Sequence, residues 1–384
     1  MKSSKLIFKN TMISEIDKFL SNTLDLSTID ADVSFNSFSN ITIFDCDLQT
    51  SLSEYNDALS KSKPIMVFVF FDHYWYGDLS NSIDREPISY SLNDIINAVN
   101  NHDINVILLT ENLYSDIELG DKCPKNLSIV VSPTGMYHDI QYDVDISKSI
   151  QTEWHVLCLN NNPRPHRVGV LLYLNYLGMN RNMHASFVSK ERWETNTPYT
   201  YDTILSYIYP NGKIKDSLNS ISLESIYRNS AEYIYNDRET TNSDNYKKLI
   251  PLYENAIVEI VTETTALENT ANIAEKFVHC VIGRCFPIII GIYKNVELYR
   301  NMGFDMFDDI IDHSYDFEPN PFYRMKMAID SNIEILTNKD LAFSFYEANK
   351  KRLDANVENY IKQYDIILAD TIGNLDAELS KFSV

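Results

Sequence analysis

The sequence is poor in the residues that interrupt regular structure. Its 384 residues include only 10 glycines and 12 prolines, against 44% hydrophobic and 12% aromatic residues. Disordered and collagen-like chains show the opposite balance, because they do not bury enough apolar surface to offset the entropy lost on ordering. We therefore expect a packed globular protein, long enough for two domains that each bury a core.

Cysteine is scarce, and the spacing of the cysteines does not indicate a set of disulfide bonds. The odd number of cysteines, with no C-x-x-C pair, favours reduced buried thiols over disulfides or a zinc site. The five positions are Cys46, Cys123, Cys158, Cys280 and Cys285.

Positive charge is also in deficit. With 33 basic and 54 acidic residues, the formal net charge is −21. Such a charge repels nucleic acids and anionic membranes on average, although a local basic groove is compatible with it. Its simplest interpretation is that it keeps the protein in solution.

Long apolar runs are missing. The runs over residues 65–71 and 286–292 are well short of the roughly 20 apolar residues of a membrane span. The basic N-terminus, MKSSKLIFKN, lacks the apolar core and cleavage site of a secretory signal. We expect no transmembrane helix and a cytoplasmic location.

Several active-site signatures are absent as well. There is no G-x-G-x-x-G, no G-x-x-x-x-G-K-[ST], no H-E-x-x-H and no G-x-S-x-G. This disfavours dinucleotide oxidoreductases, P-loop enzymes, zinc proteases and serine hydrolases. The histidines are scattered, and even His155 and His166 lack metal-site spacing, so we expect no metal site.

What is present is a pattern of buried strands alternating with polar or helix-compatible segments. In the first half, unbroken apolar runs at 65–71, 105–109 and 128–131 are typical of strands buried on both faces. Polar residues follow each run, where a doubly wound sheet places its carboxyl edge. Residues 1–150 are thus predicted to form a Rossmann-like domain, and Asp72 and Glu111, at strand ends, are our candidates for a general base.

The second half repeats the alternation. Strands are predicted at 154–159, 257–261 and 286–290, and helices at 167–177, with Gly178 as a stop, and at 273–283. Two more helices, at roughly 321–336 and 340–368, close the chain. Residues 190–250, rich in Tyr and Asn, are interpreted as an insertion with short helices. These features predict a second Rossmann-like domain over residues 151–384.

Two segments of this half are similar to segments of a known protein family. One reads L-N-N-N-P-R-P-H-R over residues 159–167. The other runs through V-T-E-T at 261–264, A-E-K-F at 274–277 and G-R-C-F-P-I at 283–288. Together they resemble the donor-binding domain of fucosyltransferase-like glycosyltransferases. Phage-encoded glycosyltransferases have a similar variant, followed by segments like 303–307 and 312–316.

The resemblance, which covers roughly residues 154–330, implies a GT-B-like fold. In that fold two Rossmann-like domains face a cleft, and the final helices often cross back onto the first domain. It further implies a phage-encoded hexosyl- or pentosyltransferase in the host cytoplasm that moves sugar from a nucleotide-sugar donor to a hydroxyl acceptor. No metal and no cofactor beyond this co-substrate is implied.

The residue types suit this chemistry. A departing diphosphate requires positive charge, which Arg167 in the first turn of a helix, its neighbour Arg164 and the helix-start Lys276 would supply. Glu263 or Glu275 would accept hydrogen bonds from ribose or sugar hydroxyls. Asp72 or Glu111 would deprotonate the acceptor.

Two alternatives stay open from the sequence. One is a phage DNA glycosyltransferase acting on a hydroxylated base, against which the net charge of −21 counts. The other is a non-catalytic nucleotide- or glycan-binding module, for which loss of the basic residues would be typical. Sugar, nucleotide, acceptor, stereochemistry and oligomeric state are not predicted.

Overall fold

The computed structural model describes the strands of the first half and most of the second half. The described residues are 35–37, 41–45, 65–70, 100–101, 105–110, 124–133, 146–151, 154–160, 165–179, 183–186, 249–264, 266, 273 and 275–382.

Five strands of the first half form one sheet. They are β1 (Phe35–Ser37), β2 (Ile41–Asp45), β3 (Ile65–Phe70), β4 (Asn105–Thr110) and β5 (Leu127–Val131), and they lie in this order. The short β1 is antiparallel to β2, whereas the other neighbours are parallel. Residues 106–109 of β4, which lies between β3 and β5, are all buried, as expected for a strand covered on both faces. The three predicted apolar runs are therefore confirmed as neighbouring strands.

Four strands of the second half form a separate sheet in which every pair is parallel. Its order is β7 (Met183–Ser186), β6 (Val156–Leu159), β8 (Val258–Thr262) and β9 (Phe286–Ile290). The predicted strands at 154–159, 257–261 and 286–290 are confirmed. The polar, four-residue β7 was not expected from the sequence.

Helices cover this second sheet. They are α5 (Pro165–Tyr176), α11 (Glu275–Ile282), α12 (Asn295–Asn301), the 3-10 turn η7 (Ser314–Phe317), α13 (Pro321–Asp330) and α14 (Ile333–Thr337). Helix α5 begins with a proline, which suits the first helical position, and Gly178 follows its end with φ of +73°. Within the described residues, no helix combines the length and apolarity needed to cross a membrane.

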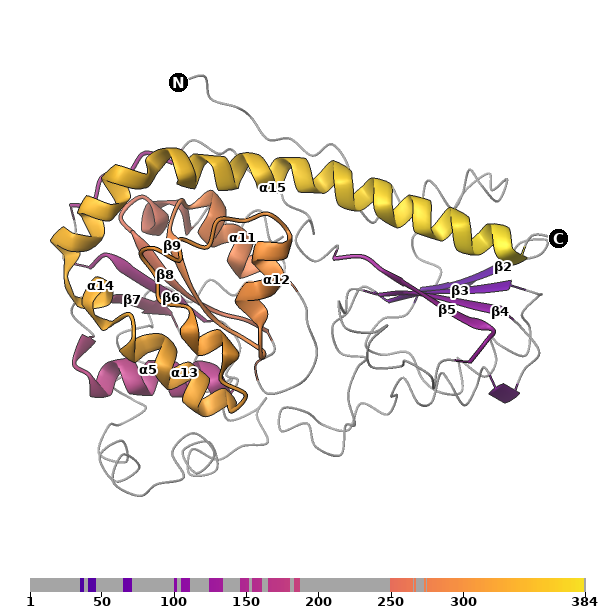
Figure 1. Cartoon of the computed structure of the whole chain (residues 1–384), viewed down its shortest axis with the longest axis horizontal. Helices are drawn as coiled ribbons and strands as arrows, with labels where there is room; N and C mark the ends of the chain where they lie inside the picture. Colours follow the sequence, from indigo (N-terminus) through magenta and orange to yellow (C-terminus); the bar gives the residue numbers. More distant parts are fainter. Residues whose placement is uncertain are drawn as a thin grey trace.

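The final helix, α15 (Lys339–Phe382), is 44 residues long and passes over both sheets (Figure 1). In the first half of α15, Asp354 accepts a hydrogen bond of 2.6 Å from Arg284, which follows α11. Near its end, the hydroxyls of Thr371 and of Ser132, just after β5, lie 2.7 Å apart. The chain thus crosses back onto the first sheet as the resemblance implied, although the helix extends well beyond residue 368.

The expected α/β class, with largely parallel sheets and C-terminal helices, is confirmed. The predicted helix at 321–336 is divided into α13 and α14 by a turn at residues 331–332. Strands β1–β5 precede residue 150 and β6–β9 follow it, but a domain boundary there stays a prediction. The predicted insertion at 190–250 lies almost wholly outside the described residues.

Candidate functional site

The carboxyl edge of the second sheet gathers the ends of its strands and the starts of its helices. Because β6, β8 and β9 are parallel, Asn160, Glu263 and Gly291 follow their strands at the same edge. Helices α5, α11 and α12 begin after these strands (Figure 1). Ligands of open parallel sheets bind at such an edge, so it is the first place to look for a site.

Arg167 lies in the first turn of α5, and its side chain is buried. Its Nη2 donates hydrogen bonds to the main-chain oxygens of Glu263, at 3.1 Å, and of Thr262, at 3.4 Å. The ring Nε2 of His166 lies 2.9 Å from the same oxygen of Glu263. These bonds to main-chain oxygens hold the end of β8 against α5 and place the guanidinium of Arg167 at the edge.

Glu263 is the first residue after β8, and only 1% of it is exposed. Its Oε1 accepts a hydrogen bond from the hydroxyl of Tyr299 on α12. Burial raises the pKa of the Glu263 carboxyl to about 7, although this hydrogen bond and the positive charges of Lys276 and Arg167 oppose the rise. A carboxyl with such a pKa gains or loses its proton near neutral pH.

Glu275 and Lys276 open helix α11 and form an ion pair, with 2.8 Å between Oε1 and Nζ. Burial opposes ionisation of Glu275, but the ammonium of Lys276 outweighs it and lowers the pKa of the carboxyl. The pKa of Lys276 is lowered by burial; Glu275 and Glu263 act to raise it, and Arg167 acts to lower it further. Four predicted site residues therefore share one electrostatic neighbourhood: Arg167, Glu263, Glu275 and Lys276.

The other three predicted site residues lie outside the described residues. They are Asp72, Glu111 and Arg164. Their proposed roles as general base and phosphate ligand stay predictions.

Arg324 is a part of this edge that the sequence did not indicate. It comes from α13 and is buried, with its Nε donating to the main-chain oxygen of Gly291 at 3.1 Å. Its Nη2 donates to Ala266 O at 3.0 Å and its Nη1 to Glu318 O at 2.6 Å. Arg324 thereby ties the loops after β8 and β9 together, a role for which the sequence holds no local signal.

The segment after α12 forms a different feature, on the outer side of β9. The ring of His313 reaches the main-chain oxygen of Pro287 at 3.2 Å, and the amide of Ile289 donates to the Tyr315 hydroxyl at 2.9 Å. The carboxylate of Asp316 accepts from the first amides of α12, at 3.0 and 3.1 Å. The Asp312–Asp316 motif therefore covers an edge strand and caps a helix.

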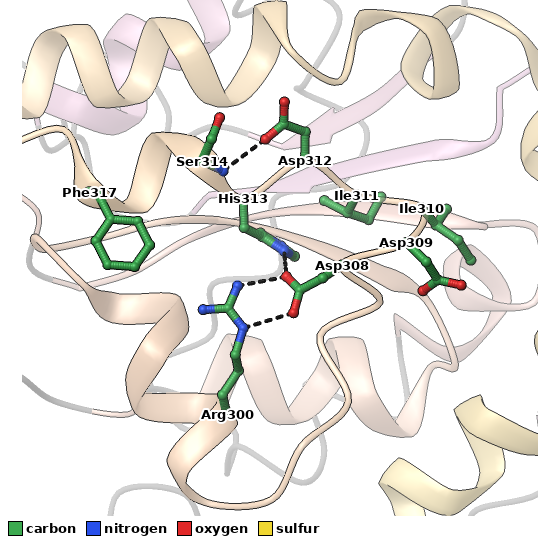
Figure 2. Close-up of a pocket in the computed structure, with 9 residues that line it drawn as sticks. All are labelled: Arg300, Asp308, Asp309, Ile310, Ile311, Asp312, His313, Ser314 and Phe317. Carbon is green, nitrogen blue, oxygen red and sulfur yellow. Dashed lines mark hydrogen bonds and ion pairs between the residues drawn. The ribbon is translucent and has the colours of Figure 1, made fainter.

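A hollow of about 410 Å³ opens on this segment (Figure 2). Arg300 forms a two-pronged pair with Asp308, at 2.9 and 2.6 Å, and Asp308 also lies 2.9 Å from His313 Nδ1. None of the predicted site residues lines this hollow. In the part of the chain that the structure describes, no three His, Cys, Asp or Glu side chains are grouped to hold a metal ion.

No family model matches this chain. No curated protein matches it in sequence either. Two similar solved structures are the DNA modifying enzyme beta-glucosyltransferase, determined with and without the substrate uridine diphosphoglucose, and T4 phage BGT in complex with UDP and Mn2+. The first is 11% identical, with a TM-score of 0.41 over 100% of this chain and 98% of that chain. The second is 11% identical, with a TM-score of 0.39 over 96% of this chain and 97% of that chain.

Proposed function

We propose that this protein is a glycosyltransferase that binds a nucleotide-sugar donor at the carboxyl edge of its second sheet. The observation that carries the proposal is the meeting of Arg167 and Lys276 at that edge, although they are far apart in the sequence. Their charges are close enough for Arg167 to lower the pKa of Lys276. Two neighbouring cations that repel each other are stabilised by a shared anion, such as the diphosphate of a sugar nucleotide.

The two cations have different roles in this proposal. The side chain of Lys276 is 14% exposed and stands in the first turn of α11, so it contacts the diphosphate directly. Arg167 is held by hydrogen bonds to the main-chain oxygens of Thr262 and Glu263. From this buried position it adds positive charge to the site and keeps the end of β8 in place. As negative charge develops on the leaving diphosphate, both stabilise it, and no metal ion is needed.

The remaining roles follow the same scheme. Glu275, one third of whose side chain is exposed, accepts hydrogen bonds from donor hydroxyls while Lys276 keeps it ionised. Arg164 adds a further phosphate contact. Asp72 or Glu111, which follow β3 and β4 in the sequence, removes the proton of the acceptor hydroxyl. The acceptor stays open among glycans, proteins, small molecules and hydroxylated bases in DNA.

Thermal-shift measurements with nucleoside diphosphates and their sugars test donor binding, since a ligand that binds the folded state raises its melting temperature. Calorimetry then compares the wild type with Lys276→Gln. Loss of one charge-assisted contact should weaken binding by about tenfold or more. Lys350→Gln is the matched control, because Lys350 lies on α15 and pairs with Glu347.

The proposal fails if no nucleoside diphosphate or nucleotide sugar binds, or if Lys276→Gln binds as tightly as the control variant. Transfer is measured separately, as release of the nucleotide product from the best-binding donor in the presence of acceptor candidates. A protein that binds donors but never releases product would be a binding module.

A further inference from the structure

Two buried polar groups near the end of β9 lack a hydrogen-bond partner among the described residues. They are Oε2 of Glu263 and Nδ2 of Asn295, the first residue of α12. Glu263 is 1% exposed and Asn295 is 2% exposed, so bulk water does not satisfy them. Leaving a donor and an acceptor unpaired in the interior costs stability, so such groups call for an explanation, such as a water, an ion or a ligand that bonds to them.

The two side chains meet beside Gly291. A Cβ atom added to this glycine would lie 1.7 Å from Oδ1 of Asn295 and 3.1 Å from Cγ of Glu263. Asn295 and Tyr299 are four residues apart and therefore share a face of α12. Since the Tyr299 hydroxyl donates to Oε1 of Glu263, this face of the helix is turned toward the carboxylate. Only a glycine leaves room for both side chains here.

The chemistry of the pair selects its ligand. A carboxylate oxygen accepts a hydrogen bond, whereas an amide nitrogen donates one. A hydroxyl group complements both, because it donates through its hydrogen and accepts through its oxygen. A phosphate complements them poorly, because it has no proton for Glu263 and carries the same charge.

We propose that Glu263 and Asn295 together bind one hydroxyl group of the donor, on either its ribose or its sugar. This inference rests on the proposed function and assigns Asn295 and Gly291 a part in donor recognition. The hydroxyl donates to Oε2 of Glu263 and accepts from Nδ2 of Asn295. Tyr299 holds the carboxylate from its other oxygen and is a positioning residue.

Calorimetry on wild type and Asn295→Ala tests the contact, with the nucleoside diphosphate that gives the largest thermal shift as the probe. In the ribose arm this probe is compared with its 2′-deoxy and 3′-deoxy analogues. If the hydroxyl is on the ribose, wild type should bind the probe about tenfold more tightly than one analogue, and Asn295→Ala should lose this difference. If the hydroxyl is instead on the transferred sugar, Asn295→Ala should weaken binding of the nucleotide sugar about tenfold and leave binding of the nucleoside diphosphate unchanged.

Thermal unfolding without ligand separates recognition from a structural role. Asn356 is the matched control, because it is also a buried asparagine. Its side-chain amide accepts from the main-chain nitrogen of Asp305 and donates to the main-chain oxygen of Asp305, each at 2.8 Å. Asn356→Ala should lower the melting temperature, whereas Asn295→Ala should lower it less, because its amide nitrogen has no bond to lose. A larger loss in Asn295→Ala would overturn the inference.

The inference is also overturned if Asn295→Ala keeps wild-type affinity for the nucleoside diphosphate, its deoxy analogues and the nucleotide sugar. In that outcome the wild type still binds nucleotides, so the proposed function stands. If the wild type binds no nucleotide at all, the proposed function and this inference fail together.

Discussion

Nη2 of Arg167 lies 3.1 Å from the main-chain oxygen of Glu263, so a side chain of α5 holds the backbone from which a second site residue projects. The guanidinium thus has two effects at this edge. It adds a positive charge, and it fixes the position of the Glu263 carboxylate.

Arg167→Ala removes both effects. We expect nucleotide binding to weaken by about tenfold or more, and the melting temperature to fall because buried carbonyl groups lose their donor. Arg167→Lys should recover part of the affinity, since an ammonium keeps the charge but has neither the planar shape nor the five N–H donors of a guanidinium. Calorimetry and thermal unfolding of both variants provide the test. Wild-type affinity in a normally folded Arg167→Ala protein would place the donor site elsewhere.

Glu259 should make stability fall as pH rises. It lies within β8, where burial raises the pKa of its carboxyl to about 8, with the hydroxyl of Tyr253 3.0 Å from Oε1. The folded state therefore holds this proton more tightly than the unfolded state. The resulting stabilisation is full below the unfolded pKa, about 4.5, and is lost as pH rises toward 8.

Glu259→Gln, which does not ionise, should lack this loss. The melting temperature of the variant relative to wild type should thus be more favourable at about pH 9 than at about pH 5. Calorimetric melting at the two pH values measures the difference. An equal difference at both would mean that the carboxyl has an ordinary pKa.

Gly291→Ala and Gly373→Ala should have opposite effects. A methyl group at 291 would overlap Oδ1 of Asn295 at 1.7 Å, so the variant must displace a buried side chain and lose stability. At 373, in α15, the added atom meets nothing within 4 Å. Alanine there should stabilise the protein by roughly 0.4–1 kcal/mol, since it restricts the unfolded chain and suits a helix. Denaturant unfolding compares them, and equal stability of the two variants would contradict the packing around Asn295.

Leu375→Ala tests the contact between the last part of α15 and the first sheet. Leu375 is fully buried in the last turns of α15, beyond Thr371, which meets Ser132 after β5. The truncation should cost about 2–5 kcal/mol. Amide hydrogen exchange should speed up both in residues 371–382 and in β5, because each covers the other. Faster exchange in the helix alone would show that the sheet does not depend on it.

The strands were predictable because their signal is local. Val, Ile and Leu runs bounded by polar residues identify β4, β8 and β9, and within the second sheet the parallel order places the ends of β6, β8 and β9 at one edge. This is why Arg167 and Lys276 could be expected to meet from the sequence.

The supporting residues were not predictable, because their roles depend on contacts between distant segments. Nothing near Arg324 indicates that it will bond Gly291 and Ala266, and Asn295 resembles any polar residue at a helix start. Strand β7 was missed because its four residues, M-H-A-S, carry no strand pattern and depend on β6 for pairing. The extension of α15 past 368 depends on Leu375 and Leu379, which are buried.

The length of α15 also orders events during synthesis. Ser132 leaves the ribosome 239 residues before Thr371, its hydrogen-bond partner on α15. At 5–20 residues per second, the first sheet waits roughly ten to fifty seconds for the segment that covers β5. During that interval β5 lacks its contact with α15, so the first sheet reaches its final packing only after nearly the whole chain has been made.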